Sequence, residues 1–158
     1  MAKSNPKTPK TAVTATVTVV KKTQATPPTS SVSKAAATPS ARNIENLEQQ
    51  RAAFAWERVQ GCSKDYTKLA KAAPALIMNN SLMQALAFYQ SKGKVHHLAL
   101  NRHLCEWLHQ RGISAQADFA SVMTALYQAD ATTFRQATEE TLALLKWIRQ
   151  FAAAVCGD

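Results

Sequence analysis

Four histidines and one cysteine lie between residues 96 and 109, and imidazole and thiolate are the usual ligands of zinc. These side chains are His96, His97, His103, Cys105 and His109. Two ligands of one ion on a helix should lie three or four residues apart, and only Cys105 and His109 do. His96 and His103 fall on the apolar face, where a core histidine is the commoner finding. We therefore expect no metal and no other cofactor.

A second possible chemistry is RNA cleavage without a metal, which needs a general base and a general acid within reach of one phosphate. Glu106 and His109 are the pair that suggests it. Arg102, four residues before Glu106, gives this carboxylate an ordinary ion-pair partner on a helix. We therefore expect no catalytic residues, and a small ribonuclease is the less favoured interpretation.

The positive charge of the chain is unevenly distributed. Residues 1–43 hold six Lys, one Arg and no acidic residue, whereas the remainder holds twelve basic and ten acidic residues, so +7 and +2 make the net charge of +9. A cationic segment of this strength favours a polyanionic partner, nucleic acid before an acidic membrane. A solubilising extension is the alternative.

Cations outside this segment form short rows that could contact phosphates without reading sequence. These rows are Lys64, Lys68 and Lys71, then Lys92 and Lys94, and finally Lys146 and Arg149. For each row, a solvated surface is the alternative interpretation.

The elements that position these residues are predicted to be helices. Residues 1–42 contain five of the six prolines, nine Thr and no aromatic residue, so we expect a disordered basic tail. Residues 43–156 predict one domain, an all-α compact bundle of five to six helices around a buried central helix. That helix is assigned to residues 74–94, whose first eighteen carry no charge and whose apolar residues cover every side. Pro74 suits its start and Gly93 its end, and frequent polar residues exclude a membrane span.

The remaining helices are predicted from caps and apolar spacing. The first runs from an N-cap at Asn43 to Gly61, and its inner stripe contains Arg51 and Arg58. Because an unpaired buried charge is costly, these arginines must meet carboxylates, such as those of Glu57 or Glu106, or face a bound anion. Further helices are expected at residues 64–73, 95–110 and 131–155, with another that follows a cap at Ser114.

Three cysteines, Cys62, Cys105 and Cys156, are too few and too far apart for a disulfide framework, and none belongs to a CxxC pair. We expect each to be a small buried apolar residue in a reducing, cytoplasmic environment.

Three blocks of the sequence together resemble the small subunit of type III-B CRISPR effector complexes, the Cmr complex. They are RAAFAWERV at residues 51–59, PALIMNNSLMQALAFYQSKGK at 74–94, and FRQATEETLALLKWIRQFA at 134–152. The resemblance spans roughly residues 43–156. Ser81 departs from it, since a glycine is expected there, and the first forty-odd residues have no counterpart in short family members.

The resemblance implies a non-catalytic subunit of antiviral defence, several copies of which stack beside the backbone subunits and contact guide RNA and target RNA. It implies no small-molecule substrate. RNA contact is implied for Arg51, Lys92, Lys146 and Arg149, with Lys94 and Arg58 ranked after them. The alternative is a general DNA-compacting helical protein that acts through its basic tail.

Overall fold

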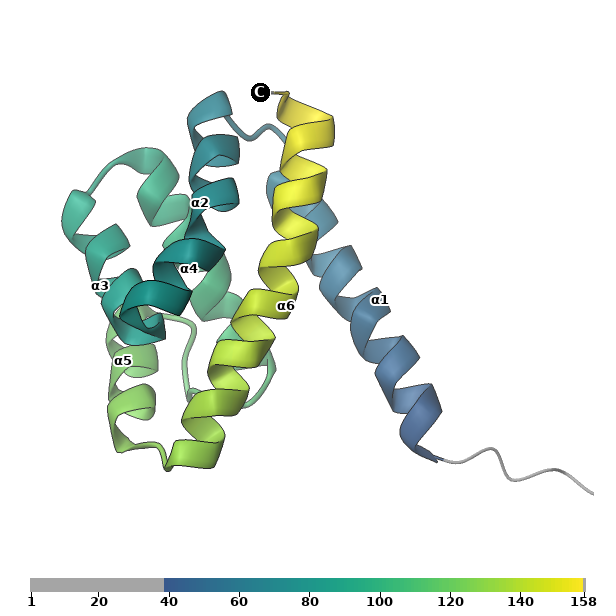
Figure 1. Ribbon diagram of the computed structural model, residues 1–158, viewed down its shortest axis with the longest axis vertical. Helices are drawn as coiled ribbons and strands as arrows, with labels where there is room; N and C mark the ends of the chain where they lie inside the picture. The colour runs from purple at the N-terminus through teal and green to yellow at the C-terminus, as the bar shows by residue number, and fades with distance from the viewer. Residues whose placement is uncertain (1–38, 158) are drawn as a thin grey trace, which may run out of the picture. The chain divides into compact units, whose positions relative to one another are not determined.

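The computed structural model describes residues 39–157, with side chains from residue 46 onward. This range contains six α-helices and no strand, which confirms the predicted all-α bundle (Figure 1). The helices are α1 Pro39–Val59, α2 Lys64–Asn80, α3 Leu82–Lys92, α4 Val95–Gln110, α5 Phe119–Gln128 and α6 Ala131–Cys156. No helix in the described range is long and apolar enough to cross a membrane.

The start of α1 differs from the prediction. The helix begins at Pro39, four residues before the predicted N-cap Asn43. Proline is well suited to the first position of a helix, where its missing N–H costs nothing. The predicted disordered tail otherwise lies outside the described residues.

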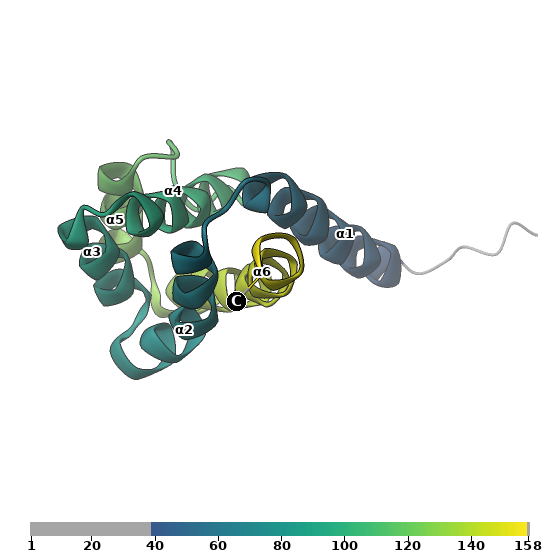
Figure 2. The same ribbon diagram turned by 90° about the horizontal axis from the view of Figure 1, so that it is seen from above.

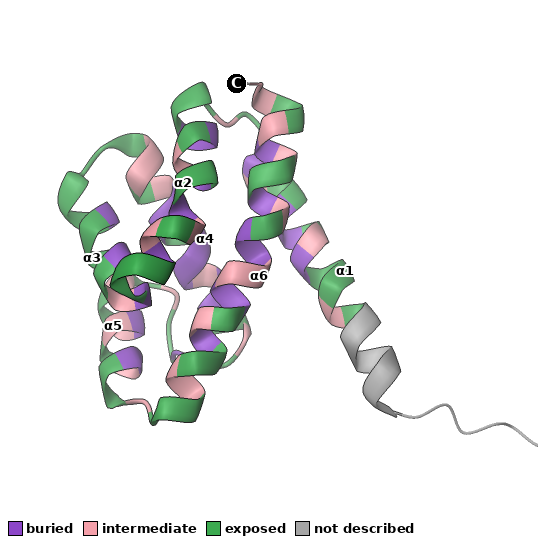
Figure 3. Ribbon diagram, viewed as in Figure 1, coloured by how far each residue is buried: buried purple, intermediate pink, exposed green. Residues whose placement is uncertain are grey.

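The core lies where the inner faces of all six helices meet. Helix α6 packs along α1 on one side and α2 on the other, as both ribbon views show (Figure 2). The buried side chains of α4 and α6 include several leucines, among them Leu104, Leu108, Leu144 and Leu145, and the buried faces turn inward (Figure 3). Each such side chain contributes roughly 1.5–3 kcal/mol to stability.

The predicted central helix at residues 74–94 is two helices, so this boundary assignment was wrong. Pro74 lies inside α2, which continues to Asn80, and α3 begins at Leu82. At the end of α2 the Ser81 N–H still donates to the Ile77 carbonyl at 2.8 Å, and the Asn80 side-chain amide donates to the Leu76 carbonyl at 3.2 Å. The intervening Ser81 has φ 81° and ψ 158°, outside helical space.

The break also changes which side chains are buried. Leu82, Leu86 and Tyr89 face the core, whereas Met78 and Phe88 are exposed. Each half is therefore amphipathic, and the prediction of burial on every side was wrong for these two residues.

The predicted cap of the fifth helix was also displaced. Helix α5 starts after Asp118, whose carboxylate accepts from the Ser121 N–H at 3.0 Å. Ser114 is instead buried in the preceding loop, where its hydroxyl donates to the Gln116 carbonyl. The predicted caps Ser63 and Asp130 are confirmed by hydrogen bonds from the N–H groups of Tyr66 and Thr133.

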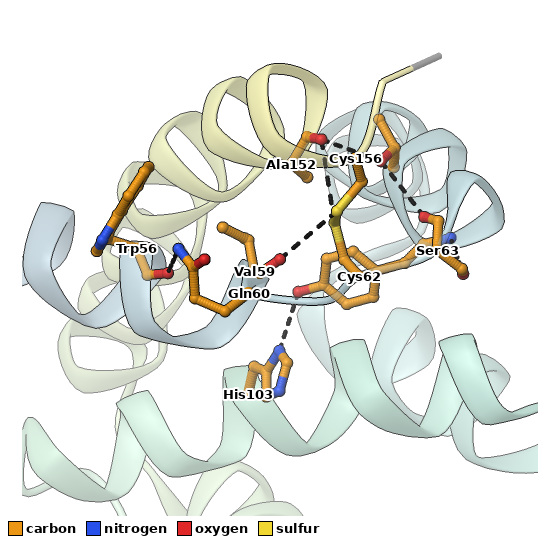
Figure 4. The surroundings of a disulfide bond; sticks show 10 residues. Trp56, Val59, Gln60, Cys62, Ser63, His103, Ala152 and Cys156 are labelled. Carbon is orange, nitrogen blue, oxygen red and sulfur yellow. Dashed lines mark hydrogen bonds between the residues drawn. A yellow bond between two sulfur atoms is a disulfide. The ribbon is translucent and has the colours of Figure 1, made fainter.

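Two of the cysteines correct the expectation of three separate thiols. Cys62, between α1 and α2, forms a disulfide with Cys156 at the end of α6, and their Cα atoms are 5.8 Å apart (Figure 4). The packing of α6 along α1 brings two residues separated by 94 positions to the same end of the bundle. Cys105 is a free, buried thiol, as predicted.

Candidate nucleic-acid interface

The row Lys64, Lys68 and Lys71 lies on the exposed side of α2. Its spacing of four and three residues places the lysines on one face of the helix. The opposite side of α2 buries Tyr66 and Ala70 against the core. The row is thus held in place by the packing of the helix that carries it.

The second pair of lysines is positioned by the turn between α3 and α4. Gly93 has φ 62° and ends α3 in the left-handed conformation, which glycine adopts without steric cost. Lys92 precedes it, with its Nζ 4.9 Å from the centre of the Phe88 ring. Lys94 follows it as the residue directly before α4.

A cavity of about 360 Å³ brings these two rows together, and we call it the α2–α4 cleft. Its lining includes Lys68 and Asp65 from α2, Lys94 from the turn, and His96 and His97 from α4. Two lysines against one aspartate leave the lining with a net positive charge. The cleft can therefore hold a phosphate of a polyanion between two helices.

His97 adds little to this charge at neutral pH. Burial lowers the pKa of its imidazole below the usual range, and the positive charges of His96, Lys94 and Lys92 lower it further. The ring is consequently neutral, and the lysines supply the positive charge. Because Lys92 and Lys94 both act on this pKa, both lie close to His97.

Arg51, a predicted RNA contact, is buried in the bundle. Its Nε and Nη2 donate to the two oxygens of Glu140 at 3.3 and 2.7 Å, and its Nη1 pairs with Glu48. Arg58 donates from Nε to Glu106 at 2.8 Å. The interpretation of both arginines as members of internal ion pairs is confirmed, although the partners of Arg51 were not anticipated.

Lys146 and Arg149 are exposed on α6 and do not line the α2–α4 cleft. Lys146 lies near Glu48, whose pKa is lowered first by the Trp147 indole, which donates to it at 2.9 Å, and also by this lysine. The structure therefore brings Lys92 and Lys94 together, places Lys146 and Arg149 on another helix, and buries Arg51. RNA contact by these five residues remains a prediction.

The groups considered for chemistry have structural partners. Glu106 accepts from Arg58 and also pairs with Arg102 at 3.7 Å, while His109 Nδ1 lies 2.9 Å from the Ser114 carbonyl oxygen. Burial raises the pKa of the Cys105 thiol to about 12, which leaves it protonated. Among the described residues, no three His, Cys, Asp or Glu side chains are grouped to hold a metal ion.

His103 is the core histidine that the apolar face predicted, with its Nδ1 2.9 Å from the Tyr66 hydroxyl. The sequence reasoning missed Asp65, His96 and His97 as lining residues of the cleft. In the sequence, these three residues are distinguished only by lying within three positions of Lys68 or Lys94. That spacing does not show that α2 lies against the start of α4.

Comparisons with known proteins agree on one family. Residues 47–155 match the family model for CRISPR-associated protein (Cas_Cmr5). The CRISPR system Cmr subunit Cmr5 of Thermus thermophilus is 32% identical over 117 residues, 71% of this chain and 97% of that protein. The crystal structure of a CRISPR-associated Cmr5 family protein from the same species is similar with a TM-score of 0.59 and 31% identity, over 69% of this chain and 96% of the other.

Proposed function

Because the chain belongs to the Cmr5 family of CRISPR-associated proteins, we propose that it is a non-catalytic, cytoplasmic subunit that binds RNA through the α2–α4 cleft. As a subunit of the Cmr effector complex, it acts in antiviral defence. Its partners in this proposal are the backbone subunits, further copies of itself, guide RNA and target RNA.

The observation that carries the RNA-binding proposal is the meeting of Lys68 and Lys94 in one cleft. Lys68 comes from α2 and Lys94 from the turn before α4, so a phosphate between them is contacted from two elements. Lys92 adjoins the cleft and extends the positive surface along the turn. Contacts of this kind give affinity for any sequence, as a subunit that follows a guide–target duplex requires.

Arg51 is not part of the proposed interface, because contact with RNA would break its buried pair with Glu140. Lys146 and Arg149 form a separate exposed row on α6. We assign them a second phosphate contact, which in a stack of subunits would reach a different stretch of the RNA.

The test measures how RNA binding depends on salt, for the full chain alone and assembled with its partner subunits. For single-stranded RNA, each phosphate contact adds about −0.7 to the slope of log affinity against log salt. The Lys68→Gln/Lys94→Gln double variant should therefore lose about 1.4 from the magnitude of the slope. Lys94 makes no side-chain cap hydrogen bond to α4, so its replacement should leave the fold intact.

Arg135→Gln is the control for removal of an exposed positive charge elsewhere, because Arg135 lies on α6 beside Glu139. Its slope should equal that of the unmodified chain. If the double variant and the control have the same slope as the unmodified chain in the assembled complex, the cleft is not an RNA contact.

The second candidate function, DNA compaction through the basic segment, rests on the charge of +7 in residues 1–43. Deletion of residues 1–38 removes most of that charge and keeps all of α1. The Cmr-subunit proposal expects the truncated chain to assemble into the effector complex. The alternative expects the affinity for duplex DNA to collapse and makes no prediction about assembly.

A further inference from the structure

A second cavity, of about 420 Å³, adjoins the α2–α4 cleft, and His96 lines both. Its charged and aromatic lining includes Arg58, Arg102, His103 and Tyr66, and no aspartate or glutamate lines it. We call it the arginine pocket. Figure 4 shows part of its surroundings, with Cys62 and Ser63 on one side and His103 facing them.

The two arginines come from different helices and share one carboxylate that lies outside the lining. Glu106 accepts from Arg58 Nε at 2.8 Å and lies 3.7 Å from Arg102 Nε. The second acidic neighbour, Glu57, is 3.9 Å from Arg58 Nη1 but is itself exposed, and water weakens such a pair. Two guanidinium groups thus line the pocket, and the carboxylate that they share does not.

His103 does not add to this charge. Burial lowers the pKa of His103 to about 4, so its ring is neutral at physiological pH. Its Nδ1 is engaged by the Tyr66 hydroxyl, which fixes the side chain beneath the arginines. The positive charge of the pocket therefore comes from Arg58 and Arg102.

We propose that the arginine pocket binds a phosphate group, carried by the end of an RNA strand or by a free mononucleotide. The guanidinium group presents a planar fork of donors that matches phosphate oxygens, and two such groups converge here from α1 and α4. The volume lies in the range of small-molecule sites. This site is distinct from backbone binding in the cleft and does not depend on it.

Arg102→Gln tests the proposal, because the Arg102 side chain is 67% exposed and its loss should not unfold α4. Arg135→Gln is a closely matched control: its side chain is 71% exposed and lies 3.8 Å from a glutamate four residues later, as Arg102 lies 3.7 Å from Glu106. The full chain is titrated calorimetrically with inorganic phosphate, adenosine monophosphate, and a short RNA with or without a 5′-phosphate. Circular dichroism checks the helix content of both variants.

We expect saturable binding that Arg102→Gln weakens about tenfold, the loss typical of one charge-assisted hydrogen bond, and that Arg135→Gln leaves unchanged. A preference for 5′-phosphorylated RNA that disappears in Arg102→Gln identifies the RNA end as the source. Binding of the mononucleotide without such a preference identifies a free nucleotide. Binding of inorganic phosphate alone with the same sensitivity supports the pocket as a phosphate site.

The proposal is overturned if no probe saturates the unmodified chain, or if Arg135→Gln weakens binding as much as Arg102→Gln. The cleft is judged separately by the salt dependence of Lys68→Gln/Lys94→Gln. Failure of the pocket therefore leaves RNA binding in the cleft intact, and failure of the cleft leaves the pocket intact.

Discussion

Ser81 is the one non-glycine residue with positive φ among the described residues, and it stands where the family resemblance predicts glycine. Its φ of 81° and ψ of 158° fall in a region that is essentially restricted to glycine. The side chain makes no capping hydrogen bond to α3, so the strain has no local compensation. The unexpected serine is thus explained as a tolerated cost at the α2–α3 junction.

Ser81→Gly should therefore stabilise the protein by about 1 kcal/mol, the strain relieved less the extra entropy of glycine in the unfolded chain. Urea unfolding followed by circular dichroism measures this change. Ser91→Gly is the control, since it lies in the last turn of α3 and should destabilise by about 0.5 kcal/mol, the difference in helix propensity. Equal or lower stability of Ser81→Gly would show that the serine is not strained.

His103 links stability to pH. Its pKa is about 4 in the folded protein because the ring is buried, whereas an unfolded histidine titrates near 6.5. The unfolded chain therefore takes up the proton first as the pH falls. The stability contributed by the neutral ring is complete above about pH 6.5 and is lost progressively between about 6.5 and 4.

Between pH 7.5 and 4.5 this single group should cost about 2.5 kcal/mol of unfolding free energy. His103→Gln removes the titration, so its stability should fall less over the same interval, although the variant starts from a lower value. Urea unfolding at both pH values gives the comparison. An identical loss in the two proteins would assign the pH dependence to other groups.

At the scale of elements, the ion pair between Arg51 and Glu140 joins α1 to α6. Both side chains are about 10% exposed, and Arg111 on the α4–α5 loop also approaches Glu140 at 3.8 Å. Loss of Glu140 leaves Arg51 with the half-exposed Glu48 alone, and breaking a buried pair costs up to about 3–5 kcal/mol. The pair therefore makes the packing of α1 on α6 sensitive to either residue.

Glu140→Gln should lower the unfolding free energy by about 3 kcal/mol, measured in urea. Its neighbour Glu139 is 70% exposed, so Glu139→Gln should change stability by less than about 0.5 kcal/mol. Arg51→Met/Glu140→Leu, which removes both charges, should recover much of the loss. A double variant as unstable as Glu140→Gln would indicate that the packing, not the isolated charge, is responsible.

The positions of most helices could be predicted from caps and apolar spacing. The α2–α3 junction and the start of α5 could not. Ser63 and Asp130 cap helices as their side-chain chemistry predicts. The sequence does not reveal the α2–α3 break, because Pro74 favours a helix start and the break lies in the backbone of Ser81, whose φ is 81°. Propensity identifies which residues favour a helix, but the backbone conformation of the single residue Ser81 marks where this helix stops.

For the whole molecule, most contacts between distant residues could not be predicted from the sequence, and the pair of Arg58 with Glu106 is the exception. The lysine pair at residues 92 and 94 was identified, but its meeting with Lys68 depends on how α4 packs against α2. Arg51 was assigned to RNA by the family resemblance, and its partner Glu140, 89 residues away, was not anticipated. Residue type and spacing identify candidate charges, whereas the tertiary packing determines which ones remain accessible.

The disulfide is the clearest example of a long-range contact that the sequence did not predict, because it joins Cys62 to Cys156 across a separation of 94 residues. A crosslink over such a long segment restricts the unfolded chain and typically adds about 2–4 kcal/mol. The α1–α6 contacts it joins are already buried, with Val59 and Ala152 both inaccessible, so the fold itself does not require the bond. Reduction should therefore lower stability and leave the helix content at 25 °C unchanged.

Thermal unfolding with and without reductant tests this expectation, with the oxidation state checked by mass spectrometry of the unreduced protein. Cys62→Ser should melt at the temperature of the reduced protein and be indifferent to reductant. Cys105→Ala is the opposite control: its thiol is free and buried, so the variant keeps the bond and should still respond to reductant. If reduction leaves the melting temperature of the unmodified chain unchanged, the crosslink adds no stability and the packing of α6 on α1 alone holds this end of the bundle.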